Sequence, residues 1–439
     1  MILERQDLKK AIINNVREYA SSMQTPSKGI PYAGRVYDQE EVSNLVDSAL
    51  EFWLTSGRYT EQFERGLAEY LNVKHCSFVN SGSSANLLAF MALTVPELGE
   101  RAICRGDEVI TAACGFPTTV APIVQYGAIP VFVDIDIPTY NVNIDCLEAA
   151  LSPKTKAIMI AHTLGNPFDL EQIKAFCDRH GLWLIEDNCD ALGAEFLFGR
   201  KWQKTGTVGD IGTSSFYPPH HITTGEGGAV YTNNVQLAQI IRSLRDWGRA
   251  CICPSGVDNF CGHRFDGQFG ILPAGYDHKY TYSHFGYNLK ATDMQAAIGV
   301  AQLKKLPSFV EKRNHNFSLL QSGLAHLKDR LIFPESCPNA HPSWFGFPMT
   351  CIARGERDKL VHALEKAGIQ TRMLFAGNLT RHPCFDAMRQ DGNGYRISGS
   401  LEQTDRVVSD TFWIGVYPGL SDENIQYMIE QVESAVAQL

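Results

Sequence analysis

Residues 182–187, Leu182-Trp183-Leu184-Ile185-Glu186-Asp187, form a short apolar run that ends in two carboxylates. A run of this length and composition predicts a buried strand. Comparable runs occur at 108–111, 130–134 and 157–161, and helical patterns separate them. This alternation predicts an α/β fold with a mostly parallel, doubly wound central sheet and helices on both faces.

The order of helical, strand and loop patterns along the chain predicts its division into domains. Helical spacing at 40–53 and 63–71 precedes the strands, and a polar, glycine-rich stretch at 254–282 interrupts the rhythm before a helical period resumes at 293–306. That stretch predicts a long functional loop. Helices at 358–367 and 422–437 and a strand at 347–351 indicate a smaller α+β domain. We therefore predict an N-terminal segment (1–39), a large domain (40–305, with its loop at about 246–282) and a small C-terminal domain (306–439).

Composition narrows the class of partner. The 439 residues are 44% hydrophobic, and the formal net charge of -9 is spread along the chain without a run of five like charges. This favours a small-molecule substrate over nucleic acid. The first residues lack a basic start followed by an apolar stretch, and no segment holds 18 consecutive apolar residues. We expect a cytoplasmic protein with no membrane contact.

Twelve cysteines without a secretion signal do not favour a disulfide framework. Eight of them fall singly among ordinary neighbours and are expected to be core residues or spectators: Cys76, Cys104, Cys114, Cys146, Cys177, Cys337, Cys351 and Cys384. Cys251, Cys253 and Cys261 instead lie close together within the predicted loop, which suggests a metal site, and Cys189 is the candidate fourth ligand. Thiolates suit zinc or an iron–sulfur cluster, and spacing alone separates the two poorly.

Two further features indicate a ligand pocket. Ser81-Gly82-Ser83-Ser84-Ala85-Asn86 precedes an apolar helical stretch, so its backbone N–H groups could hold an anion, although a simple cap is the common alternative. Asp187 ends a predicted central strand, where open α/β sheets bind their ligands. A carboxylate there can keep a pyridine nitrogen protonated and make that ring an electron sink. A turn or helix cap is the other interpretation of Asp187.

The motif at 214–228, Ser-Ser-Phe-Tyr-Pro-Pro-His-His-Ile-Thr-Thr-Gly-Glu-Gly-Gly, resembles one that carries the cofactor-binding lysine in sugar aminotransferases. With Gly82-Ser83, Phe116 and Asp187 upstream, the chain resembles the DegT/DnrJ/EryC1/StrS sugar aminotransferase and dehydratase family, which has the aspartate-aminotransferase (type I) pyridoxal-phosphate fold. The resemblance implies these cofactor-binding roles: Gly82, Ser83 and Ser215 on the phosphate, Phe116 stacked on the ring, Asp187 on its nitrogen, and Asn288 reaching the phosphate from the other subunit of a homodimer.

The chain departs from the family pattern at two positions. Asp190 stands where the family often has Gln, and His220 stands at the position of the lysine. Imidazole has no primary amine, but it gives and takes protons near neutral pH. No lysine occurs between Lys204 and Lys279, so the cofactor is expected to bind without a covalent link, as pyridoxamine phosphate (PMP/PLP). We interpret His220 as the catalytic base; an inert relic or a satisfied core histidine is the alternative, and His221 is expected to be structural.

The cysteine spacing together with His220 resembles an iron–sulfur subgroup of this family, the 3-dehydrases of nucleotide-linked, in particular CDP-linked, 4-keto-6-deoxyhexoses. Segments 246–249, 282–284 and 375–381 add to the resemblance. It implies a [2Fe–2S] cluster on Cys189, Cys251, Cys253 and Cys261, a flavin-containing NAD(P)H-dependent iron–sulfur reductase as electron donor, and a place in bacterial lipopolysaccharide O-antigen biosynthesis. Arg372 and Arg381 are candidates for contacts with the substrate diphosphate.

Two other functions stay open from the sequence. One is a cluster-free dehydratase that regenerates its pyridoxamine cofactor with glutamate, its cysteines holding zinc or nothing. The other is a non-catalytic nucleotide-sugar sensor with a pyridoxal-enzyme fold. An ordinary aminotransferase ranks last because the lysine is absent.

Overall fold

The computed structural model describes residues 2–22, 29–251, 253, 257 and 259–439. Its centre is an eight-stranded sheet in the order β1-β9-β8-β5-β4-β2-β3-β14. Neighbouring strands are parallel from β8 to β14, and β9 pairs antiparallel with both β1 and β8. The mostly parallel sheet is therefore confirmed. The strand bounds are β1 His75–Val79, β2 Glu108–Ala112, β3 Ile129–Val133, β4 Thr155–Ala161, β5 Trp183–Asp187, β8 Ile211–Ser215, β9 Gly228–Thr232 and β14 Arg396–Ile397.

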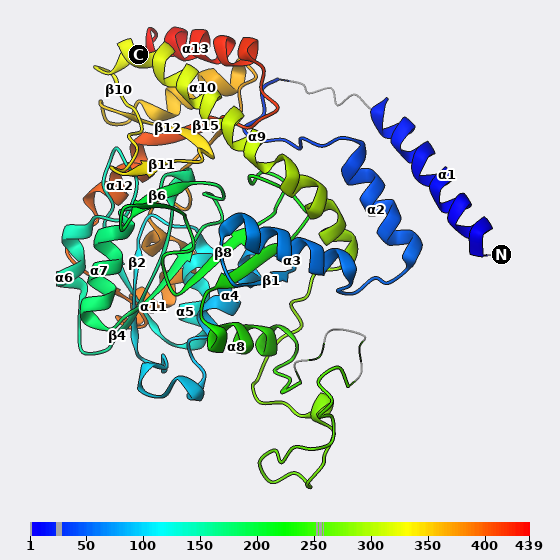
Figure 1. Ribbon diagram of the computed structural model, residues 1–439. Helices are drawn as coiled ribbons and strands as arrows, with labels where there is room; N and C mark the ends of the chain where they lie inside the picture. The colour runs from blue at the N-terminus through cyan, green and yellow to red at the C-terminus, as the bar shows by residue number, and fades with distance from the viewer. Residues whose placement is uncertain (1, 23–28, 252, 254–256, 258) are drawn as a thin grey trace.

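Helices cover both faces of this sheet (Figure 1). On one face α4 (Gly82–Met91) and α8 (Val235–Arg245) bury their apolar residues against the strands. On the other face α6 (Leu147–Ala150) and α7 (Leu170–His180) do the same. The helix α5 (Pro117–Tyr126) follows β2. The helix α3 (Arg58–Leu71) shares a core with α9, and α2 (Gln39–Glu51) also packs on α9. This burial on both faces explains why the parallel strands are almost continuously apolar.

The C-terminal part forms a second layer around a four-stranded sheet, β10-β12-β15-β13. Its strands are β10 Leu331–Ile332, β12 Gly346–Cys351, β13 Thr371–Arg372 and β15 Thr411–Gly415, and they share a core with α10 (Arg357–Lys366) and α13 (Asp422–Val436). The remaining elements are the small sheet of β6 (Glu195–Phe198), β7 (Lys201–Lys204) and β11 (Ala340–His341), with α11 (Asp386–Asp391) and α12 (Glu402–Asp410).

One long helix connects the two sheets. The helix α9 (Asp293–Leu324) starts at a capping box of Thr292 and Gln295 and continues through Pro307. The sequence predicts a helix only to residue 306, so the observed helix is longer; its buried residues continue at helical spacing to Leu324, and this tertiary packing holds the helix together beyond the proline. The domain boundary predicted at 305/306 falls inside α9, and the division into domains stays a prediction.

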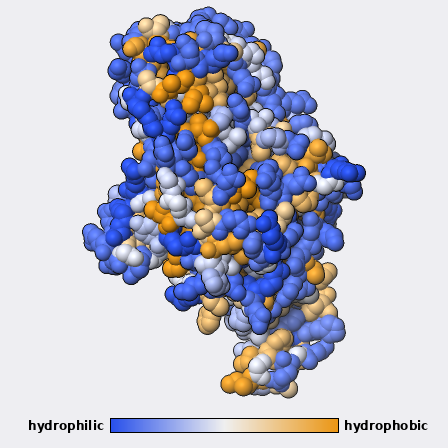
Figure 2. All heavy atoms as spheres, turned by 90° about the vertical axis from the view of Figure 1, so that its left-hand side faces the viewer, coloured by the Kyte–Doolittle hydropathy of each residue, from blue (hydrophilic) through white to orange (hydrophobic). Residues whose placement is uncertain are grey.

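The N-terminal helix α1 (Ile2–Ser21) lies beside α2 at the edge of the molecule (Figure 1). At the bottom of Figure 1, the segment between α8 and α9 projects away from the sheet, and its outer part carries hydrophobic surface (Figure 2). Its described residues contain one short 3-10 helix, η4 (His278–Tyr280), in agreement with the predicted loop; residues 252, 254–256 and 258 lie outside the described residues. Backbone bridges Asp246–Asn288 and Arg249–Tyr282 close the base of this loop.

Among the described residues, no helix has the length and apolarity needed to cross a bilayer. The predicted cytoplasmic location stays a prediction.

Candidate active site

A cavity of about 380 Å³ opens beside the carboxyl ends of the parallel strands. One wall comes from the segments that follow β1, β2, β5 and β8, and the facing wall comes from Tyr32, Phe345, Trp413 and the segment 372–375. Of the residues predicted for the site, the cavity is lined by Gly82, Ser83, Phe116, Asp187, Cys189, Ser215, His220 and Arg372. Asn288 and Arg381 do not line it.

The first turn of α4 and the end of β8 form one corner of the cavity. Ser81 caps α4 by accepting a hydrogen bond from Ser84 N at 3.0 Å. A Cβ atom at Gly82 would lie 2.4 Å from the Cβ of Ser215, so only glycine allows the two backbones to approach this closely. The corner presents helix N–H groups and the hydroxyls of Ser83 and Ser215, a donor set that suits a phosphate.

Asp187 lies at the end of β5 and is only 3% exposed. One carboxylate oxygen accepts hydrogen bonds from Asn86 Nδ2 and Thr119 Oγ1, both at 2.7 Å. The other accepts one from Cys189 N at 3.2 Å. Three donors fix this carboxylate in one orientation at the cavity wall, as a partner of a ring nitrogen must be.

Phe116 is 51% exposed although it borders this buried carboxylate. It stands at the N-cap of α5, immediately before Pro117. An aromatic ring with a free face beside the cavity can stack on a planar ligand. Together the corner formed by α4 and β8, Phe116 and Asp187 fit the three parts of pyridoxal or pyridoxamine phosphate: its phosphate, its ring face and its ring nitrogen.

His220 faces Asp190 across the cavity wall, with Nε2 3.4 Å from Asp190 Oδ1. Both side chains are nearly buried, at 16% and 12% exposed. The ring packs against Phe345, with centroids 5.5 Å apart, and its Nδ1 atom is buried without a hydrogen-bond partner among the described residues. An imidazole held by a carboxylate on one nitrogen is oriented as a general base requires.

The neighbouring His221 is oriented differently. It is 2% exposed and its Nε2 contacts the carbonyl oxygen of Ser343 at 2.8 Å. Burial, followed by the charge of Arg313, holds the pKa of His221 well below its usual value. Burial also lowers the pKa of Arg313 to about 9, against the opposing effect of Asp190. These contacts agree with the structural role expected for His221.

Sequence reasoning missed three contacts of the site. It did not predict that Asn86 and Thr119 bind Asp187, or that Asp190 pairs with His220. Thr213 extends the network by donating to Asn86 Oδ1 at 2.6 Å. Asn86 closes the serine-rich stretch that begins at Ser81, which is the available signal in the sequence.

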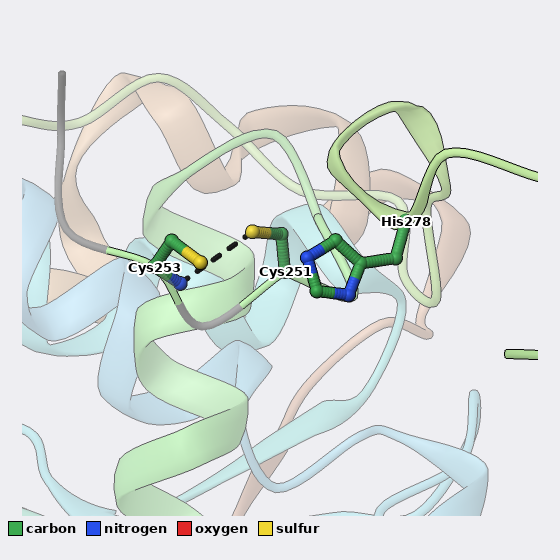
Figure 3. Close-up of side chains that lie close together, drawn as sticks. All are labelled: Cys251, Cys253 and His278. Carbon is green, nitrogen blue, oxygen red and sulfur yellow. Dashed lines mark hydrogen bonds between the residues drawn. The ribbon is translucent and has the colours of Figure 1, made fainter. Parts of the chain in front are cut away.

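The cysteines of the loop converge on a histidine. Ligand atoms of Cys251, Cys253 and His278 all lie within 4.8 Å of one another. Figure 3 shows the three side chains pointing toward one another. Cys261 Sγ lies 3.6 Å from His278 Nε2. Of the residues that the structure describes, Cys251, Cys253 and His278 form the one group compact enough for a metal ion. The residue spacing in the sequence does not predict His278 as a member of this group.

Cys189 is not part of this thiol group. It lies in the cavity wall next to Asp187, and burial, followed by the charge of Asp187, raises the pKa of its thiol. Its role as a cluster ligand stays a prediction. Among the eight cysteines expected to be inert, five are buried, while Cys104 and Cys384 are exposed and Cys146 is intermediate.

The two candidate substrate arginines differ in position. Arg372 lines the cavity with its guanidinium 3.9 Å from the centroid of the Tyr32 ring. Arg381 forms an ion pair with Asp405, and its side chain is 63% exposed. Asn288 lies at the base of the projecting loop, outside the cavity of its own chain. Its predicted contact with the other subunit's phosphate stays a prediction.

Comparison with known proteins agrees with this geometry. The chain is 52% identical to the lipopolysaccharide biosynthesis protein RfbH of Salmonella typhimurium, over 97% of this chain and 98% of the relative. It is 48% identical to the dTDP-4-dehydro-2,6-dideoxy-D-glucose 3-dehydratase of Saccharopolyspora spinosa, over 98% and 93%. Among solved structures, a GDP-4-keto-6-deoxymannose-3-dehydratase with a trapped PLP-glutamate geminal diamine superimposes with a TM-score of 0.79 at 29% identity, over 92% of this chain and all of that one.

The solved structure shares the arrangement of strands and helices described above, which confirms the type I pyridoxal-phosphate fold. The family model of the DegT/DnrJ/EryC1/StrS aminotransferases matches residues 36–433, a span that includes both sheets and every residue lining the cavity except Tyr32. By fold, by site and by sequence, this chain belongs to the DegT/DnrJ/EryC1/StrS aminotransferase family.

Proposed function

We propose that the protein is a nucleotide-sugar 4-keto-6-deoxyhexose 3-dehydratase that uses pyridoxamine phosphate. The observation that carries the proposal is His220: it stands in the position of the family lysine, lines the cavity beside Asp187 and faces Asp190 at 3.4 Å. A site with an intact cofactor wall and a histidine in place of the lysine can transfer protons but cannot form the covalent lysine link. The Saccharopolyspora relative and the solved relative are both 3-dehydratases of keto-deoxysugars, which supports the same reaction.

Bound pyridoxamine phosphate would supply an amine for the C4 ketone of the sugar and an electron sink for the carbanion formed beside its ring. Asp187, fixed by its three donors, would keep the ring nitrogen protonated. His220 would remove a proton from the C4′ carbon, and Asp190 would stabilise the imidazolium that results. The C3 hydroxyl would leave as hydroxide, and together with the proton that His220 takes from C4′ it would account for the water lost.

Replacement of His220 by Asn tests this assignment. The amide keeps a polar group of similar size but cannot act as a base near neutral pH. We expect the variant to bind pyridoxamine phosphate normally, as measured by its absorbance, and to lose C3–O cleavage of the sugar. Unchanged turnover would show that another group is the base.

We further propose that the three loop cysteines and Cys189 bind a [2Fe–2S] cluster that passes single electrons from a flavin-containing NAD(P)H-dependent reductase. The convergence of Cys251, Cys253 and Cys261 around His278 supports a metal site. In this case the product is a 3-deoxy sugar. The test is the iron and acid-labile sulfide content of anaerobically purified protein, compared with Cys251→Ala. About two irons and two sulfides per chain, lost in the variant, are expected for one such cluster.

The competing candidate is a cluster-free dehydratase that regenerates its cofactor with glutamate. The solved relative with a PLP-glutamate adduct favours this route. Absence of iron after anaerobic reconstitution, together with turnover that depends on glutamate, would decide for it.

Three finer parts of the proposal rest on the sequence resemblance. CDP is proposed as the nucleotide, although the Saccharopolyspora relative is named for a dTDP-linked sugar and the solved relative for a GDP-linked one. Comparison of CDP-, dTDP- and GDP-linked substrates tests it. A homodimer is proposed because Asn288 lies outside its own cavity. A role in lipopolysaccharide O-antigen biosynthesis is supported by the name of the Salmonella relative.

A further inference from the structure

The thiol group of the loop is surrounded by N–H donors as well as by other sulfurs. The backbone N–H of Cys253 donates to Cys251 Sγ at 3.5 Å. The backbone N–H of His263 donates to Cys261 Sγ at 3.4 Å, and His278 Nε2 lies 3.6 Å from the same sulfur. His278 is therefore the one side chain among these three contacts, and the only one that a substitution can remove.

His278 is held in this position by its surroundings. It is 8% exposed in a loop whose neighbouring Tyr280 is 57% exposed. Its backbone N–H donates to the carbonyl oxygen of Arg264 at 3.1 Å, and Arg264 pairs with Asp277 at 2.6 Å. Asp277 in turn caps η4 by accepting from Lys279 N. An ion pair and a helix cap thus hold the segment that carries the buried imidazole. Figure 3 shows this imidazole beside the sulfurs of Cys251 and Cys253.

We propose that His278 donates a hydrogen bond from Nε2 to the Cys261 thiolate and thereby raises the reduction potential of the cluster. Hydrogen bonds to the sulfurs are one of the main determinants of iron–sulfur potentials. Uptake of one electron from the proposed reductase adds one negative charge to the cluster. An N–H dipole directed at a coordinating sulfur stabilises that added charge, so reduction becomes easier. The inference rests on the proposed cluster.

The test uses the full-length protein, reconstituted anaerobically with iron and sulfide. His278→Leu removes the donor and puts an apolar side chain of comparable size in its place, while His278→Gln retains an N–H donor. His263→Leu is the matched control: its side chain is 77% exposed, and its backbone donor to Cys261 is unaffected by the substitution. Iron, sulfide and the midpoint potential are measured for each variant by a redox titration followed by electron paramagnetic resonance.

We expect His278→Leu to keep its iron and sulfide and to show about a tenfold smaller equilibrium constant for reduction, which is about 59 mV for one electron. His278→Gln should lie between this variant and the parent, and His263→Leu should equal the parent. An intact cluster with an unchanged potential in His278→Leu would refute the proposed role of the His278 hydrogen bond and leave the proposed cluster standing. Loss of iron in both His278 variants, with nitrogen hyperfine coupling in the parent, makes His278 a ligand instead. A parent without iron overturns the cluster itself.

Discussion

Thr119→Val isolates one of the three hydrogen bonds that hold Asp187. The substitution is nearly isosteric, and Thr119 is 2% exposed, so packing changes little while the 2.7 Å bond to the carboxylate is lost. A hydrogen bond to a charged group contributes about 1.5–3 kcal/mol. The carboxylate keeps Asn86 and the Cys189 N–H, and its 3% exposure limits the access of water in place of the lost donor. We expect the free energy of unfolding of the cofactor-free protein to fall by about 1.5–3 kcal/mol.

The measurement is urea unfolding followed by fluorescence and by circular dichroism, each with and without pyridoxamine phosphate. Thr118→Val, on the preceding residue of α5, is the control for unfolding because the Thr118 hydroxyl makes no hydrogen bond with the described residues; Thr118 lines the cavity, so cofactor binding is compared with the parent instead. Cofactor binding should also weaken in Thr119→Val, since the carboxylate is less firmly oriented toward the ring nitrogen. If Thr119→Val and Thr118→Val unfold at the same urea concentration and Thr119→Val binds the cofactor as tightly as the parent, Asp187 does not depend on this network.

Two further predictions follow from side chains whose surroundings differ. Arg372→Gln should raise the KM for the nucleotide sugar about tenfold, the effect of losing about 1.4 kcal/mol of binding, whereas Arg381→Gln, outside the cavity and paired with Asp405, should leave it unchanged; equal effects in steady-state kinetics would contradict the assignment. In metal-free protein, Cys253 should react with iodoacetamide faster than Cys189, because the pKa of Cys253 is lowered by hydrogen bonds that outweigh its partial burial, while burial raises that of Cys189. Peptide mass spectrometry after brief labelling at pH 8 measures both sites.

The sheet could be predicted because its strands carry their own signal. The runs at 108–111, 130–134, 157–161 and 182–186 each lie within one or two residues of β2, β3, β4 and β5. They are apolar throughout because helices cover both faces, and such burial leaves a local trace in the sequence. The length of α9 was underestimated because Pro307 locally reads as a helix end, whereas packing on both sheets sustains the helix.

The site was predictable only in part, because local motifs are visible in the sequence whereas contacts between distant elements are not. Gly82 and Asp187 stand at element ends, where short motifs describe them well. The bonds from Asn86 and Thr119 to Asp187 join α4 and α5 to β5, so they depend on how the helices pack over the sheet. His278 likewise reaches the cysteines through loop folding that no residue spacing specifies.

The carboxylates that line the cavity offer a physical reason why a histidine could transfer protons at the position of the family lysine. In the proposed reaction, two carboxylates of the cavity wall would each face a cation: Asp187 a protonated ring nitrogen, and Asp190 the imidazolium formed when His220 takes a proton. At a separation near 4 Å, opposite charges attract by about 4 kcal/mol at an effective dielectric constant of 20. If His220 is the base, this attraction would arise when it takes the proton and would favour the state that follows transfer. On the proposed function, Asp190 would therefore support His220 in the proton transfer.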